Sequence, residues 1–247
     1  MYPVAIGVID SETNENWDWF MKRLKEAIGT PPGLTFSTDC GQAVMHGVSE
    51  VFPNAEHREC MWHLAQSFKK RFSGKIFYEH LWPSSYSWSK YMFEKHYQAM
   101  AAAKPKAMKY LQENHNKLWT KSQFGTVCKV DYVTNNLAEC FNKWIKAEKT
   151  KHVDDLMDAI RQKLLIKWNT RKKVAKQFVG KILPHVMQQL REDTFKLDIE
   201  VITENEGVAE VCAKGGIGFR FVVDLRNRTC SCRAWQRLLK RAHISRD

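Results

Sequence analysis

The stretch covering residues 34–64 constrains the fold more than any other part of the chain. Residues 34–38 are β-rich and lead directly to an acid, Asp39. Apolar residues then recur at helical spacing from Val44 to Phe52, and Pro53 ends the helix that they predict. A carboxylate at the tip of a buried strand suits Mg²⁺, which needs only one or two protein carboxylates. Ordinary turn chemistry also places aspartate there, so both interpretations are open.

A cysteine and a histidine follow this unit at a spacing that can bind metal. Residues 57–63 read HRECMWH and contain Cys60 and His63, with His57 nearby. A thiolate and an imidazole three residues apart can bind zinc, although two ligands do not complete a tetrahedral site. The alternative is a buried cysteine beside a capping or core histidine.

Three sequence blocks carry a family resemblance. They are the strand–Asp–helix–FPxAxHRxCxxHL arrangement of residues 34–64, the TNNLAECFN stretch of residues 134–142, and residues 223–236, which contain TCSCRAWQ. In this order they resemble the Mutator-like (MULE) transposases of plants, over residues 2–236. Domesticated relatives, the far-red-response type of transcription regulators, have the same layout. The resemblance therefore does not by itself imply active transposition.

The resemblance implies an RNase H-like core of the DDE transposase class, in which carboxylates hold two Mg²⁺ or Mn²⁺ ions. Asp39 and Glu139 would supply two of three carboxylates. On its predicted helix Glu139 lies about 200° from Leu137, and a surface glutamate near a positive helix end is the other interpretation. The family's hairpin with the first catalytic aspartate has no counterpart here. Asp10 aligns with a non-catalytic position and Asp18 lies on a helix, so we expect a catalytically incomplete polypeptide.

The fold class expected is α/β, with a partial RNase H-like domain over residues 1–192. Residues 2–9 are β-branched and apolar and predict a strand buried on both faces. Residues 15–28 predict a helix closed by Gly29. Together with residues 34–38 they predict a right-handed βαβ unit, and residues 56–59 could add a short strand.

An all-helical insertion is expected over about residues 73–130, as the family layout also implies. This stretch is rich in aromatic residues and has helical patterns over residues 88–103 and 105–114. Its aromatics could stack on unpaired bases, but their helical spacing favours a core. Farther along, residues 153–179 predict one long helix with Leu156, Ile160, Leu164 and Trp168 on its inner face.

The second region, residues 193–247, predicts a small antiparallel sheet, because residues 196–202 and 218–225 alternate in polarity and residues 208–212 lie between them. The sheet leads to Cys230 and Cys232. By resemblance this pair begins a SWIM zinc finger, in which Cys-x-Cys is followed by Cys-x-His. His243 is present, but Arg241 occupies the position of the second motif's cysteine. We therefore expect an incomplete zinc finger with three soft ligands.

Positive charge points to a polyanionic partner, with DNA the first candidate. The net charge is +12, and residues 143–181 hold twelve Lys and Arg against four Asp and Glu. A solvated helix face is the alternative explanation. The candidate nucleic-acid-binding residues are Arg161, Lys163, Lys167, Arg171, Lys172, Lys173 and Lys176.

The sequence shows neither a secretory start nor a stretch near the ~18 apolar residues of a membrane span. Its seven scattered cysteines are therefore expected to be thiols or zinc ligands, and a nuclear location follows from DNA binding. The function expected is that of a transposase-derived DNA- and zinc-binding protein. The alternatives are a non-catalytic transcription regulator of the domesticated type and a non-functional relic. The oligomeric state is undetermined.

Overall fold

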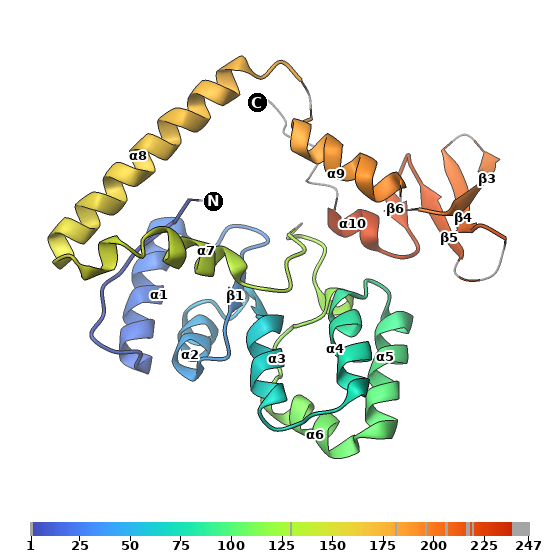
Figure 1. The fold of residues 1–247 in the computed structure, drawn as a ribbon, viewed down its shortest axis with the longest axis horizontal. Coiled ribbons are helices and arrows are strands. Elements are labelled where there is room, and N and C mark those ends of the chain that lie inside the picture. Colours follow the sequence, from blue (N-terminus) through green and yellow to red (C-terminus); the bar gives the residue numbers. More distant parts are fainter. Residues whose placement is uncertain are drawn as a thin grey trace.

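The structure is a computed structural model that describes residues 2–128, 130–180, 182–195, 197–205, 207–215, 218 and 220–238 (Figure 1). The elements, in chain order, are α1 (Asn14–Ile28), β1 (Thr35–Thr38), α2 (Gln42–Val51), β2 (Glu56–Glu59), α3 (Met61–Lys69), α4 (Lys75–Tyr86), α5 (Lys90–Ala103), α6 (Pro105–Asn114), the 3₁₀ turn η1 (Lys121–Gln123), α7 (Asn136–Trp144), the 3₁₀ turn η2 (Glu148–Thr150), α8 (Val153–Gln177), α9 (Pro184–Phe195), β3 (Ile199–Asn205), β4 (Val208–Ala213), β5 (Arg220–Asp224), β6 (Thr229–Cys230) and α10 (Ala234–Leu238).

A βαβ unit forms the N-terminal body of the molecule. β1 and β2 pair in parallel with Thr38 opposite Glu59, and α2 connects them. α1 packs on α2 closely because Gly47 has no side chain, and a Cβ there would meet the Trp17 backbone at 3.2 Å. The apolar faces of both helices share a buried cluster that includes Met21 and Val48. The α/β class is thus confirmed, and the βαβ unit is β1–α2–β2.

The prediction of a buried strand over residues 2–9 is wrong. The segment has no regular structure, and Val4 and Val8 are 78% and 53% exposed. A strand needs a partner for its backbone groups, and among the described residues β1 pairs only with β2. The segment instead reaches α8, where the Tyr2 hydroxyl donates a hydrogen bond of 3.2 Å to the Lys167 carbonyl oxygen.

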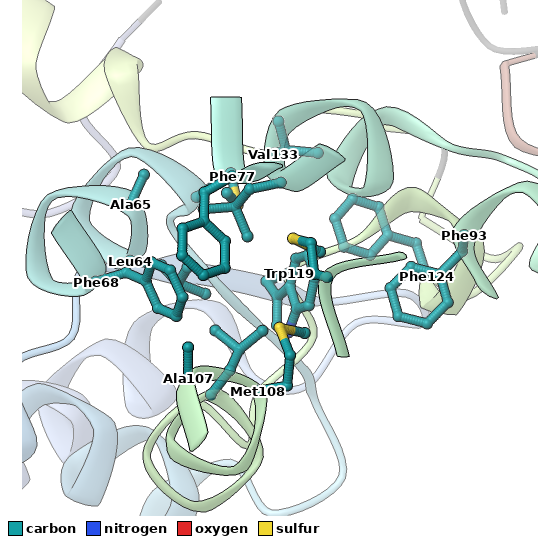
Figure 2. Close-up of a cluster of buried hydrophobic side chains, with 14 residues drawn as sticks. Leu64, Ala65, Phe68, Phe77, Phe93, Ala107, Met108, Trp119, Phe124 and Val133 are labelled. Carbon is teal, nitrogen blue, oxygen red and sulfur yellow. The ribbon is translucent and has the colours of Figure 1, made fainter. Parts of the chain in front are cut away.

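The helices after β2 build the larger core, as Figure 2 shows. α4, α5 and α6 confirm that the stretch is helical, while its role as an insertion stays a prediction; with α3 they enclose Phe68, which is fully buried. Phe77 and Trp119 are buried in the same cluster. Most aromatics of this stretch are therefore buried in the core or packed against it, whereas Tyr78, Tyr86 and Tyr91 are exposed.

α8 confirms the predicted long helix, but its inner face is only partly covered. Ile160 is 3% exposed, whereas Trp168, predicted inside, is 58% exposed. The second half of α8 extends away from the βαβ body (Figure 1), and its apolar side there meets mainly the N-terminal segment: the Tyr2 and Trp168 ring centroids lie 5.7 Å apart. The described part of the chain contains no helix with the length and hydrophobicity of a membrane span.

The C-terminal region is an antiparallel sheet, as predicted, and its strand order is β3-β4-β5-β6. Val211 lies opposite Val201 on one side and Phe221 on the other. The proposed boundary between residues 192 and 193 falls inside α9 and stays a prediction.

Candidate functional site at the end of the parallel strands

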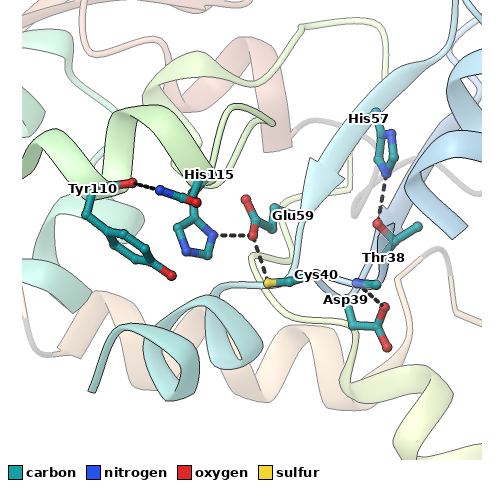
Figure 3. Close-up of polar contacts among 9 residues, drawn as sticks. Thr38, Asp39, Cys40, His57, Glu59, Tyr110 and His115 are labelled. Atoms are coloured by element: carbon teal, nitrogen blue, oxygen red, sulfur yellow. Dashed lines mark hydrogen bonds and ion pairs between the residues drawn. The ribbon is translucent and has the colours of Figure 1, made fainter. Parts of the chain in front are cut away.

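Asp39 lies directly after β1, at the carboxyl end of the parallel pair (Figure 3). Its side chain is exposed, and its Oδ1 accepts a hydrogen bond of 3.1 Å from the Gly41 backbone N–H. This turn leads into α2 and fixes where the carboxylate points. Asp39 is thus held by local backbone geometry while remaining accessible.

Cys60 joins the end of β1 to the start of α7. Its backbone N–H donates a 2.8 Å hydrogen bond to the Thr38 carbonyl oxygen, and its Sγ accepts a 3.3 Å hydrogen bond from the Asn135 N–H. Glu139 is exposed in the first turn of α7. Asp39 and Glu139 therefore lie on two segments that meet at one residue. Within the described residues neither belongs to a group of three potential metal ligands, and their catalytic assignment stays a prediction.

The Cys60–His63 pair is built into the start of α3. Cys60 is fully buried at the N-terminal end of that helix. His63 is half-buried with its ring edge-on to Trp62, and its Nδ1 has no hydrogen-bond partner among the residues that the structure describes. Structural and metal-binding roles remain open for this pair.

His57 faces β1 rather than the Cys60–His63 pair. A 2.8 Å hydrogen bond joins its Nε2 to the Thr38 Oγ1 (Figure 3). Burial lowers the pKa of His57 to about 4, and the positive charge of Lys117 acts in the same direction. The imidazole is therefore neutral at physiological pH.

Two buried polar side chains and one half-buried thiol meet beside Asp39 in a cluster that the sequence did not predict (Figure 3). The Cys40 thiol donates to Glu59 Oε1 over 2.8 Å, and His115 Nδ1 lies 2.6 Å from the same oxygen. Burial and the neighbouring Glu59 raise the pKa of the Cys40 thiol well above its usual range. The three residues are 19 and 56 positions apart, so no local motif reveals them. The one available signal was Glu59 itself, an acid at the end of a segment that could add a short strand.

The candidate DNA-binding residues of α8 fall into two groups. Arg161 pairs with Asp158 at 2.7 Å and Lys163 with Glu148 at 2.6 Å. Lys167 and Arg171 lie over the Tyr2 ring, at 5.8 Å and 4.9 Å from its centroid. A second group at the end of the helix is exposed and makes no ion pair with other described residues; it consists of Lys172, Lys173 and Lys176.

Cys230 and Cys232 bring their thiols together at the end of the C-terminal sheet. The two Sγ atoms lie 2.8 Å apart, and the Gln236 side-chain amide donates to the Cys230 carbonyl oxygen. Burial and the neighbouring thiol raise the pKa of Cys230 to about 11. His243 and Arg241 lie outside the described residues, so the structure gives no placement for the third predicted ligand.

Comparison with known proteins finds a family-model match at the N-terminal end of the chain. The family model of the MULE transposase domain matches residues 1–67, a segment that contains Asp39, Cys60 and His63. The chain is also similar to Protein FAR1-RELATED SEQUENCE 5 of Arabidopsis thaliana, with 28% identity over 80 residues. That match spans 32% of this chain and only 10% of the relative. The MULE resemblance is thus confirmed over the first block.

Proposed function

We propose that this chain is a transposase-derived protein that binds DNA through the exposed end of α8. The MULE match over residues 1–67 supports the ancestry, and the net charge of +12 supports a polyanionic partner. The observation that carries the proposal is the group of exposed lysines at the end of α8, because cations without protein partners are free to contact phosphates.

Exposed aromatic and apolar side chains lie on the same helix. Trp168 is 58% exposed and lies one turn before Arg171 and Lys172. Cations interleaved with an aromatic surface suit nucleic acid, since phosphates bind the charges and unpaired bases stack on rings. Arg161 and Lys163, by contrast, are engaged with carboxylates and are expected to contribute less.

Salt-dependent DNA binding tests the proposal. We expect Lys172→Ala/Lys173→Ala/Lys176→Ala to weaken binding and to reduce the slope of log K against log [salt] by about 0.9 for each phosphate that the variant no longer neutralises. The control removes three other exposed lysines, in Lys90→Ala/Lys104→Ala/Lys106→Ala, so that the net charge is the same. Equal weakening in both variants would show that overall charge, rather than α8, accounts for binding.

We further propose that Cys230 and Cys232 contribute two thiolates to a SWIM-type zinc site. The proximity of their Sγ atoms fits half of a tetrahedral site, and His243 or an outside group would supply the remainder. We expect zinc that survives dialysis to fall by one equivalent in Cys232→Ser. Unchanged zinc content in that variant would contradict this assignment.

Catalysis by this polypeptide alone is not expected. By resemblance, Asp39 and Glu139 supply two of the three carboxylates of an RNase H-like site, and two-metal occupancy should fall when one is missing. By resemblance Asp10 aligns with a non-catalytic position, and its Oδ1 accepts hydrogen bonds from Ser11 and Asn16 at the start of α1. Mn²⁺-dependent nicking of labelled DNA that Asp39→Asn abolishes would overturn this expectation.

Binding without nicking would favour the non-catalytic regulator over an active transposase. A plant nucleus is the location we propose, since the relative comes from Arabidopsis thaliana and the proposed partner is DNA. If the folded protein does not bind DNA, the alternative of a non-functional relic is favoured.

A further inference from the structure

The Cys40–Glu59–His115 cluster shares no ligand with the metal sites considered above. Its three ligand atoms, one sulfur, one carboxylate oxygen and one imidazole nitrogen, all lie within 4.8 Å of one another. They come from the loop after β1, the end of β2 and the residue after α6. Three unlike ligands from distant segments, converging at one point, are typical of a metal site.

The cluster also contains buried polar atoms without partners. The side chains of Glu59 and His115 are 2% and 4% exposed. Glu59 Oε2 and His115 Nε2 make no hydrogen bond in the described part of the chain. Orphaned polar atoms at such depth are costly and call for an explanation such as an ion or water. Cys40 is only half-buried, which leaves a route of entry from solvent.

We propose that Cys40, Glu59 and His115 bind one Zn²⁺ ion. Thiolate, imidazole and carboxylate are the ligand types that zinc accepts at about 2.0–2.3 Å, and the thiolate disfavours Mg²⁺ and Ca²⁺. Ligand atoms around such an ion are about 3.3 Å apart or slightly more. Since the present separations along the cluster are 2.8 Å and 2.6 Å, each side chain needs to move by less than about 1 Å.

The charge balance favours zinc at this depth. Zinc replaces the thiol proton of Cys40. Thiolate, carboxylate, neutral imidazole and Zn²⁺ then sum to zero. Binding therefore leaves no unbalanced charge in the protein interior.

Bound zinc would fasten the loop that carries Asp39 to β2 and to the end of α6. Three protein ligands leave a fourth position, which a water molecule or a further ligand fills. The ion would thus link the βαβ unit to the helical insertion directly beside the candidate catalytic carboxylate.

Zinc analysis in a Cys230→Ser/Cys232→Ser background tests this site without the C-terminal thiols. We expect one equivalent of tightly held zinc there, lost on Cys40→Ser and on Glu59→Gln but retained on Cys140→Ser, which removes an exposed thiol of α7. Circular dichroism confirms that each variant is folded. Absence of zinc in this background, or retention in Cys40→Ser, would overturn the proposal.

Thiol alkylation with the wild-type chain avoids reliance on folded variants. Zinc should slow the modification of Cys40 by iodoacetamide at least tenfold, whereas Cys140 should react at the same rate with and without zinc. Mass spectrometry separates the two cysteines by peptide. Equal rates for Cys40 with and without zinc would contradict the site, and equal slowing of both cysteines would show non-specific binding instead.

Discussion

Arg58 places a charged guanidinium in the interior, at 2% exposure. Its Nε donates to Glu56 Oε1 over 2.6 Å, its Nη1 donates to the Val130 carbonyl oxygen, and its Cζ lies 3.9 Å from the Phe124 ring centroid. Glu56 Oε2 in turn accepts from the Gly125 N–H at 2.7 Å. This network ties the last part of the insertion, residues 124–130, back to β2.

Arg58→Met should lower the free energy of unfolding by about 3–5 kcal/mol, since it leaves the Glu56 carboxylate without its ion-pair partner. Urea unfolding followed by circular dichroism measures the change. Arg58→Lys should not restore stability, because an ammonium cannot reproduce the planar contacts of the guanidinium. The double variant Glu56→Gln/Arg58→Met should lose less stability than the two single variants lose when their losses are added together. If the losses are fully additive, the two residues do not interact.

His57 predicts a specific pH dependence of stability. Its pKa is about 4 in the folded chain and about 6.5 when unfolded, so the unfolded state binds the extra proton first as pH falls. Stability from His57 is fully present above pH 6.5, declines between about pH 6.5 and 4, and changes no further below that range. The stability lost from His57 across this pH range is about 3 kcal/mol.

Comparison of His57→Gln with the wild type isolates this effect, because the carboxylates contribute similarly to both proteins. Urea unfolding at pH 4, 5, 6 and 7 should show a steeper decline for the wild type, and the two curves should converge toward acid pH. Parallel curves would mean that the imidazole is not desolvated as the structure shows.

Sequence reasoning reached the residues that local patterns mark and missed those that the fold brings together. Asp39 and Cys60 stand in a continuous motif, and the family match covers them. Glu59 and His115 are joined only because β2 runs beside the end of α6. Spacing in sequence carries no information about such a contact, so the cluster could not be predicted.

At the scale of elements, Phe68 on α3 anchors the helical insertion. It is fully buried, and its ring lies 4.8 Å from Phe77 and 5.2 Å from Phe72, centroid to centroid. Phe68→Ala should cost about 3–5 kcal/mol of stability, because it removes buried apolar surface and leaves a cavity. The matched control is Phe195→Ala at 93% exposure, which should change stability by no more than about 0.5 kcal/mol in the same urea titration. Similar effects at both positions would contradict the placement of the core.

Helices were predictable because their periodicity and end signals are local. α1 ends before Gly29, and α6 begins at Pro105 as expected. The strand predicted over residues 2–9 does not form, because a strand depends on a hydrogen-bonding partner elsewhere in the chain. The prediction that Trp168 is a core residue was wrong for a similar reason. An apolar stripe predicts which face of a helix is buried, but not which other segment covers that face.

At the scale of the whole molecule, packing is unevenly distributed. The two large buried clusters draw on residues between Met21 and Val133. In the C-terminal sheet the buried apolar residues within the described part of the chain are Cys212 and Cys230. Sparse burial implies low local stability, so the sheet should open more readily than the βαβ unit and the insertion.

Hydrogen exchange with and without zinc tests whether the C-terminal sheet is less stable than the rest of the molecule. It also distinguishes the two proposed metal sites. Without zinc, amides of β3–β5 should exchange far faster than those of α3 and β2. Zinc at 100 times its dissociation constant stabilises the bound form by about 2.7 kcal/mol. Binding at Cys230 and Cys232 should therefore protect β5 and β6, and binding at Cys40 should protect β1, β2 and the end of α6. α8 carries neither site, so its amide exchange rates should be the same with and without zinc. If zinc protects α8 to the same extent, the cause is association of the protein rather than metal binding at these clusters.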